Sequence, residues 1–246
     1  MDVAVKRNGR LLVLMLIFLT STSFCLIPFV KCQETMSLKS IADGSVEKLR
    51  PDSNFGEFWK LQVSTATAEP GVSYAYVMFD LSEIPGTIQS AELSLFCDNV
   101  TETQLIAVHF CSDNTWTETG ITWNNIPSFN SEATNSVVVT ENNKWYGWDV
   151  TSDVKTASGT AGQKLTLVLV GTTTTEKGYV EFYSRDGIGG LRPMITITYE
   201  AAAAGFPVSL LIEVAAAVGA SLGVAILVYF KFLKNHPQRT MGNQPC

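Results

Sequence analysis

Aromatic side chains at outward strand positions are the residues of this sequence best suited to bind a ligand. A pyranose ring offers an apolar C–H face and a rim of hydroxyl groups, so a sugar site needs exposed aromatic rings beside hydrogen-bonding groups. In the segment 145–150 the side chains alternate, so Trp145 points outward if Val150 points into the core. By the same alternation Tyr76 lies opposite Val77, with packing between neighbouring strands as the alternative. The predicted carbohydrate-binding residues are Trp145, Tyr76, Trp59, Lys60 and Arg185.

Three carboxylates in expected loops are candidates for a structural Ca²⁺ site. Asp43, Asp52 and Asp80 could bind the ion together with backbone carbonyls, because Ca²⁺ prefers oxygen ligands. Their spacing matches no fixed ligand pattern, and the alternative is that Asp43 and Asp80 cap turns. We therefore expect that no cofactor is required, and keep a structural Ca²⁺ as the alternative.

The residue patterns typical of enzymes are missing from the sequence. Only two histidines are present, His109 on an expected strand and His236 in the C-terminal tail. The sequence contains no Gly-x-Ser-x-Gly, His-Glu-x-x-His or Cys–His arrangement. No pair of carboxylates stands in a context that singles it out as acid and base. We therefore predict that the protein is not an enzyme.

A segment near the middle of the chain, residues 116–127, carries two tryptophans and two asparagines. Trp116 and Trp123 could stack on sugars, but we expect them to fill one end of a sandwich core with each indole N–H bonded locally. Asn124 and Asn125 are expected to hydrogen-bond the backbone of the turn. These four residues are therefore predicted to be structural.

Short alternating segments separated by turn residues fill the chain between residues 37 and 200, and no stripe of helical period is present. About ten strands at this spacing predict an all-β fold, a single jelly-roll-like antiparallel β-sandwich. Asp43-Gly44 is expected to form a turn, and 152–157 a single helical turn. The expected strands are 37–41, 59–65, 74–81, 91–98, 104–111, 136–140, 145–150, 164–171, 179–184 and 193–199.

The two cysteines of this region are expected to be separate. If the strands around 99–103 form a hairpin, Cys97 faces Leu105 and Cys111 lies near Ala91, about 20 Å away. Reduced thiols are therefore favoured over a disulfide. Asn99 begins the only Asn-x-Ser/Thr sequence, so it is the predicted glycosylation site, in the loop of that hairpin.

The two ends of the chain predict export and membrane anchoring. Residues 1–32 have a basic start and an apolar stretch typical of a signal peptide, with an uncleaved anchor as the alternative. Residues 33–200 would form the ectodomain, 201–205 a linker and 206–230 a transmembrane helix. Basic residues follow in 231–246, which predicts a cytoplasmic tail by the positive-inside rule. A small-residue face within the helix could support a homodimer: Ala215, Gly219 and Gly223.

The charge of the expected ectodomain restricts its partners. Residues 33–205 carry 21 acidic and 10 basic residues, a net charge of −11, whereas the whole chain has a net charge of −6. Such a surface disfavours nucleic acid and phosphate-rich partners. Uncharged glycans remain compatible with it.

Several short sequences occur together in the order expected of a known family. The segment 37–200 resembles the DNRLRE-type, or disaggregatase-related, domain, an extracellular β-sandwich of bacteria and archaea that is classed among carbohydrate-binding modules. The segment 116–127 carries the most specific part of the match, whereas Ser184-Arg-Asp186 has aspartate where the family more often has glutamate. The resemblance implies glycan binding or a role in cell-surface architecture. Its other motifs are Ala42-Asp43, Pro51–Gly56, Tyr76–Pro85, Ser90–Leu95, Trp148–Thr151, Phe182–Asp186 and Pro193–Tyr199.

These observations predict a membrane-anchored cell-surface module that binds a polysaccharide without catalysis. The alternative is a structural or adhesive protein of the cell envelope that binds protein neighbours. Exposure of the aromatic residues distinguishes the two, because burial of Trp145, Tyr76 and Trp59 together would reject the glycan hypothesis.

Overall fold

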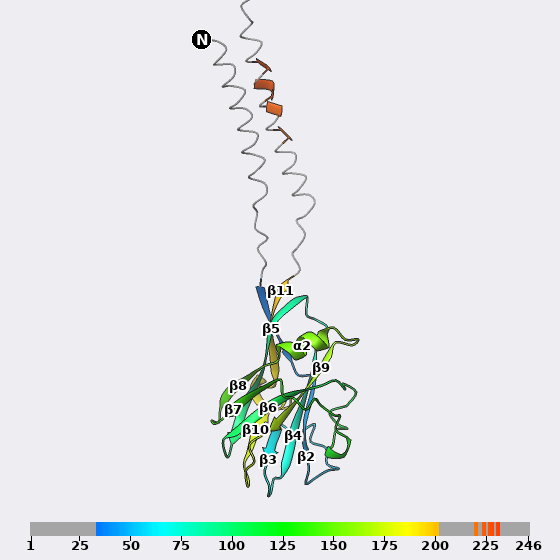
Figure 1. The fold of residues 1–246 in the computed structure, drawn as a ribbon, viewed down its shortest axis with the longest axis vertical. Helices are drawn as coiled ribbons and strands as arrows, with labels where there is room; N and C mark the ends of the chain where they lie inside the picture. Colours follow the sequence, from blue (N-terminus) through cyan, green and yellow to red (C-terminus); the bar gives the residue numbers. More distant parts are fainter. Residues whose placement is uncertain (1–32, 202–218, 221–222, 225, 229, 232–246) are drawn as a thin grey trace, which may run out of the picture. The chain divides into compact units, whose positions relative to one another are not determined.

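The computed structural model shown in Figure 1 describes residues 33–201 and, near the C-terminus, 219–220, 223–224, 226–228 and 230–231. The chain divides into two units, Met1–Ala202 and Ala203–Cys246. In the second unit the described residues are helical and include Gly219 and Gly223. Among the residues that the structure describes, no helix combines the length and the apolar character needed to cross a membrane. The predicted signal segment, most of the linker, Ala215 and the tail after residue 231 lie outside the described residues.

The first unit is mostly β-structure, with eleven strands in its described part. The strands are β1 (Gln33–Lys39), β2 (Ala42–Glu47), β3 (Lys60–Thr65), β4 (Val72–Asp80), β5 (Gly86–Val100), β6 (Gln104–Cys111), β7 (Asn135–Val139), β8 (Lys144–Asp149), β9 (Lys164–Gly171), β10 (Tyr179–Tyr183) and β11 (Met194–Ala201). One helix, α2 (Thr151–Ser158), and two short 3-10 turns, η2 (Trp123–Asn125) and η3 (Ile188–Gly190), complete it.

The strands form one antiparallel sheet that folds over on itself into two layers. The order is β1-β11-β5-β10-β3-β4-β9-β6-β7, with β8 added beside β5 and β2 beside β4. β3 and β4 pair only at Ser64↔Ser73 and Thr65↔Val72, and the sheet turns there. We call β1, β11, β5, β10, β3 and β8 the first layer, and β2, β4, β9, β6 and β7 the second layer (Figure 1).

The main core lies between the two layers, because alternate side chains of both point inward. Leu93, Leu95 and Cys97 of β5 are fully buried there, as is Phe79 of β4. Trp148 of β8 is also fully buried, and its Nε1 donates to the carbonyl of Ile106 at 2.9 Å. The alternation that the sequence predicts for these strands is therefore confirmed.

Two predictions about local structure are wrong. Asp43 and Gly44 lie inside strand β2, opposite Val77 and Tyr76 of β4, and do not form a turn. β5 extends from Gly86 to Val100 and pairs with β8, β10 and β11 but not with β6, so the hairpin around 99–103 does not form. The chain instead crosses from the first layer to the second after Val100. Both described cysteines, Cys97 and Cys111, are free and buried.

Candidate functional site

Four aromatic side chains form a continuous line on the outer face of the first layer. We call Trp59, Tyr183, Phe96 and Trp145 the aromatic row. Trp59 immediately precedes β3, and the others come from β10, β5 and β8. The ring centroids are 5.9 Å apart between Trp59 and Tyr183, 5.9 Å between Tyr183 and Phe96, and 5.4 Å between Phe96 and Trp145.

Strand register and alternation explain why these rings meet. Phe96 lies directly opposite Trp145 in the β5–β8 pair, and Tyr183 lies opposite Lys60, the neighbour of Trp59, in the β10–β3 pair. In their strands the neighbours of Phe96, Tyr183 and Trp145, such as Phe182, point into the core, so these three rings point outward. Trp59 lies just before β3, and its ring contacts that of Tyr183. Trp59 and Trp145 are 40% and 38% exposed, and the two rings between them are half-buried.

A group of charged and amide side chains lies beside the row on the same face. We call Lys60, Asp98, Asn99 and Glu181 the polar cluster. The Lys60 Nζ contacts Asp98 Oδ2 at 2.7 Å and Glu181 Oε2 at 2.8 Å. Asn99 Nδ2 also donates to Glu181 Oε2, at 3.4 Å. The Lys60 ammonium lies 4.3 Å from the centroid of the Trp59 ring, a cation–π distance.

An irregularity in β5 gives the cluster its composition. Phe182 pairs with Cys97, but the preceding Glu181 pairs with Asn99, so Asp98 is an extra residue in that strand. Such β-bulges change the direction of side chains and often occur next to functional sites. Here the bulge lets Asp98 reach Lys60 while Asn99 still pairs with Glu181.

Hydrogen bonds hold the charges of this surface in fixed states. Burial disfavours the charged form of Lys60, but its hydrogen bonds to Asp98 and Glu181 together outweigh that effect and raise the pKa of the ammonium. The hydrogen bond from Lys60 lowers the pKa of Asp98. A hydrogen bond to Asp98 raises the pKa of the Tyr183 phenol, which therefore stays protonated as a donor. The row and the cluster are thus linked into one prearranged surface.

The structure brings together three of the five predicted carbohydrate residues, Trp145, Trp59 and Lys60. The prediction that Tyr76 binds carbohydrate is wrong, because its side chain is fully buried. Residues 112–134, which we call the covering segment, lie over the outer face of the second layer and form a second core with it. The Tyr76 hydroxyl donates to the carbonyl of Pro127 at 3.0 Å, within that core. In the second layer, a side chain that alternation places on the outer face can therefore still be buried.

Arg185 lies in a different network. Its Nη1 donates to the carbonyl of Ile41 at 2.7 Å and to Glu118 Oε2 at 2.9 Å. Its backbone N–H donates to Asp43 Oδ2 at 2.9 Å, and the Ser40 hydroxyl donates to the same oxygen at 3.0 Å. Arg185 thus joins the start of β2 to the covering segment, a structural task that occupies its guanidinium.

The three aspartates of the predicted Ca²⁺ site do not come together. Asp43 is bound within the Arg185 network, Asp52 accepts from Asn124 Nδ2 at 2.7 Å, and Asp80 accepts from the Ser82 backbone N–H at 2.9 Å. That backbone bond lowers the pKa of Asp80. In residues 33–201 and the short described helical pieces, no group of three or more His, Cys, Asp or Glu side chains is placed to hold a metal ion.

The tryptophan and asparagine motif, residues 116–127, has a local structural role, as expected. It does not lie at the end of the sandwich core, where it was predicted. Trp116 Nε1 donates to Thr166 Oγ1 at 3.0 Å, and the Trp123 ring lies 5.1 Å from that of Tyr74. Asn125 bonds the turn backbone, donating to the carbonyl of Gly120 at 2.8 Å, whereas Asn124 bonds Asp52. The motif lies over the outer face of the second layer and does not close the end of the main core.

Asn99, the predicted glycosylation site, lies in the paired part of β5 and not in a hairpin loop. Its amide nitrogen contacts Glu181, so the residue belongs to the polar cluster. Glycosylation at Asn99 stays a prediction.

Half of the aromatic row, Phe96 and Tyr183, is absent from the predicted carbohydrate-binding residues. Phe96 alternates with the buried Leu95 and Cys97, and Tyr183 follows the buried Phe182. This alternation marks both rings as outward. The sequence does not show, however, that β10 lies beside β5, which is the contact that joins them to the two tryptophans.

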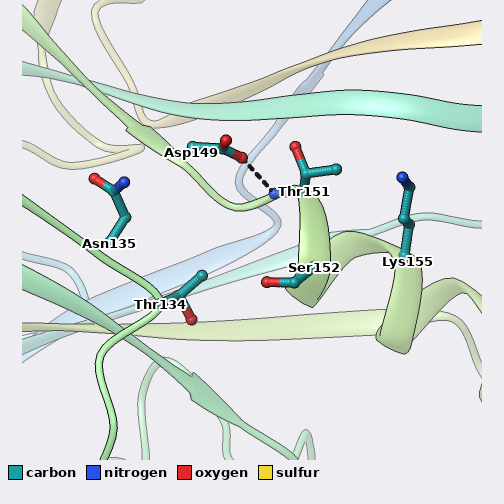
Figure 2. Close-up of a pocket in the computed structure, with 6 residues that line it drawn as sticks. All are labelled: Thr134, Asn135, Asp149, Thr151, Ser152 and Lys155. Carbon is teal, nitrogen blue, oxygen red and sulfur yellow. Dashed lines mark hydrogen bonds between the residues drawn. The ribbon is translucent and has the colours of Figure 1, made fainter.

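A shallow polar pocket of about 410 Å³ lies elsewhere, between the start of β7 and the start of α2. Figure 2 shows its lining: Thr134, Asn135, Asp149, Thr151, Ser152 and Lys155. The Thr151 backbone N–H donates to Asp149 Oδ1 at 2.9 Å, and the Thr151 hydrogen bonds lower the pKa of Asp149. The pocket has no aromatic lining residue, so it lacks a ring on which a sugar can stack.

Comparison with known proteins assigns the β-structure to a family. The model of carbohydrate-binding module family 96 matches residues 34–199, which is nearly the whole β-structure. A gellan lyase from a Bacillus species is 25% identical over 158 residues. That match includes 62% of this chain but only 6% of the lyase, so this chain corresponds to a small part of that protein. The chain belongs to carbohydrate-binding module family 96.

Proposed function

We propose that the protein binds a polysaccharide, without catalysis, on the aromatic row. The single observation that carries this proposal is the line of four rings on an open face, with fixed hydrogen-bonding groups beside it. The rings supply apolar surfaces for the C–H faces of sugars. Asn99 and the carboxylates of the polar cluster supply partners for hydroxyl groups. Family membership supports the same ligand class.

Rigidity of the surface favours useful affinity. Binding loses free energy when mobile side chains become ordered, and groups that are already fixed avoid that loss. Tyr183, Trp59 and Lys60 are held by hydrogen bonds, ring packing and the cation–π contact before a ligand arrives. The gellan lyase relative shows a similar segment inside a much longer protein. This fits a binding module whose catalytic partner, where one exists, is a different domain.

A single substitution tests the proposal. Trp145→Ala is expected to weaken binding by about tenfold, because one stacked ring contributes roughly 1–1.5 kcal/mol and 1.4 kcal/mol corresponds to a factor of ten. Binding of the full chain would be measured first on a glycan array and then by calorimetry with a polysaccharide that binds. Trp145→Phe keeps a ring and should keep most of the affinity.

Tyr76→Phe is the matched control, because it alters a buried aromatic residue away from the row. It should leave glycan affinity unchanged while lowering stability slightly through loss of the bond to Pro127. Unchanged affinity in Trp145→Ala would reject Trp145 as a sugar platform. If wild-type protein bound no glycan on the array, the structural or adhesive role would be preferred.

We also propose where the protein acts. The basic, apolar start of the chain and the apolar segment 206–230 support an exported domain of the DNRLRE type, held by one membrane span with its tail in the cytoplasm. Protease added to intact cells is then expected to degrade residues 33–200 and to spare the tail. Survival of the β-sandwich in intact cells, with degradation after lysis, would reject this orientation.

A further inference from the structure

We infer that the aromatic row takes the interior of a single, flexible glycan chain that lies across the strands, and that it selects against chain ends and against the flat face of a crystalline polysaccharide. This inference rests on the proposed function and specifies the physical form of the ligand. It follows from the orientation, direction and open ends of the row.

The rings are not coplanar. Trp59 and Tyr183 are inclined by 42°, Tyr183 and Phe96 by 32°, and Phe96 and Trp145 by 78°. A flat crystalline surface can lie parallel to only one plane, so it could contact one of these rings face-on but not the whole row. A single chain can turn about its glycosidic bonds from one sugar to the next. Each sugar can therefore follow the inclination of its own ring.

The row runs across the strands, with one ring for each successive strand. Strands in a sheet are about 4.8 Å apart, and the centroid spacings of the row are only slightly larger. This spacing is close to the length that each sugar adds to a pyranose chain. Consecutive rings can thus face consecutive sugars, and a short oligosaccharide would fill the row.

Both ends of the row are open. At one end, β8 is hydrogen-bonded to β5 and to no other strand of the described part, and Trp145 is 38% exposed. At the other end Trp59 is followed by Phe58, whose ring lies 6.2 Å away and is 48% exposed. Recognition of a glycan chain end requires a wall or a pocket of the protein that contacts the terminal hydroxyls of the glycan. Beyond Trp59 the exposed ring of Phe58 continues the surface, and at the other end the row finishes on the exposed ring of Trp145. Open ends of this kind suit a chain that passes through.

The test uses the full chain with three probes: gellan, acid-swollen amorphous cellulose and microcrystalline cellulose. Disaccharide, tetrasaccharide and hexasaccharide fragments are prepared from a polymer that binds. We expect binding to a soluble or amorphous polymer, with affinity rising at least about tenfold from disaccharide to tetrasaccharide and changing little beyond it. Reduction of the hexasaccharide end by borohydride opens only its terminal ring, so it should leave the affinity of this fragment unchanged.

Variants at the two ends of the row sharpen the test. Trp59→Ala and Trp145→Ala should each weaken hexasaccharide binding, because the longer ligand contacts both rings. A disaccharide can contact only part of the row, so at least one of the two variants should leave its affinity within about twofold. Tyr76→Phe again serves as the control.

The outcomes separate this inference from the proposed function. Binding restricted to microcrystalline cellulose, a disaccharide as tight as the polymer, or loss of binding after end reduction would overturn the inference and keep glycan binding. Failure of the full chain to bind any of the three polymers and any glycan of the array would overturn both.

Discussion

Replacing Phe96 and Tyr183 together by alanine is expected to weaken polysaccharide binding by at least about 100-fold. Each ring that stacks on a sugar contributes on the order of 1–1.5 kcal/mol, and 1.4 kcal/mol corresponds to a factor of ten in affinity. The two rings are the middle members of the row, so their loss also leaves Trp59 and Trp145 without their neighbours. Titration calorimetry with a polysaccharide that binds wild type gives the comparison.

The fold should survive this double substitution, because both side chains lie on the outer face and outside the main core. A double substitution on β11, Thr196→Ala with Thr198→Ala, is the matched control, since these residues also alternate with buried core residues of the first layer. Circular dichroism and thermal unfolding verify that both variants are folded. Wild-type affinity in the folded aromatic variant would show that the sugar binds elsewhere.

Asp43→Asn is expected to stabilise the protein near neutral pH by up to about 4 kcal/mol. Burial raises the pKa of the Asp43 carboxyl to about 7 from an ordinary value of 3.8. The Arg185 N–H and the Ser40 hydroxyl oppose this rise, whereas the negative charges of Glu118 and Asp186 add to it. Asp43 Oδ2 accepts both hydrogen bonds and Oδ1 is buried without a partner. An asparagine amide oxygen can accept the same two bonds without carrying a charge.

The direction of the pH effect follows from the raised pKa. A carboxyl that is harder to ionise when folded gives its full stabilisation below the unfolded value of 3.8, and that stabilisation is lost as the pH rises towards 7. The difference in free energy of unfolding between Asp43→Asn and wild type should therefore grow from about pH 4 to about pH 7 and then stay constant. Urea unfolding at several pH values measures it. A difference that does not change with pH would contradict this account.

The sequence is sufficient to predict most of the strands and their buried faces, although not β2. The expected strands 104–111 and 164–171 coincide with β6 and β9. In β5 the alternation of Leu93, Leu95 and Cys97 with outward residues is as expected. This success has a simple cause, because a two-residue period is set by local backbone geometry and by burial on one face.

The candidate site is only partly predictable, because it depends on which strands are neighbours. Lys60 and Trp145 can be selected as outward residues, but they come from strands that are not consecutive in the layer. Trp59 has the parity of the buried Leu61, and it reaches the outer face because it lies before the start of β3. Their connection requires β10 between β3 and β5, a long-range pairing without a local signal. The sequence alone therefore does not show which distant segments of the chain are in contact.

The same limit explains the errors at Tyr76 and Asp43. Tyr76 has outward alternation, but the covering segment, more than thirty residues later in the chain, buries it. Asp43-Gly44 has the composition of a turn, but hydrogen bonds with residues far away in the chain hold Asp43 in a strand. The Asp43 backbone N–H donates to Glu118 Oε1 at 2.9 Å, and its carboxylate accepts from Arg185. In both cases tertiary partners override a local preference.

The length of β5 determines how the module would respond to mechanical load. β5 pairs with β11 from Ser94↔Met194 to Gly86↔Ala201, and Phe96 lies just beyond the first of these pairs. A pull at Ala201 against a glycan held at Phe96 would thus act along the ladder, over about 33 Å of strand. Antiparallel hydrogen bonds lie perpendicular to the strands, so this shearing force is shared among them. A pull that separates Gln33 from Glu200 would instead open the β1–β11 pairs one after another, which requires less force.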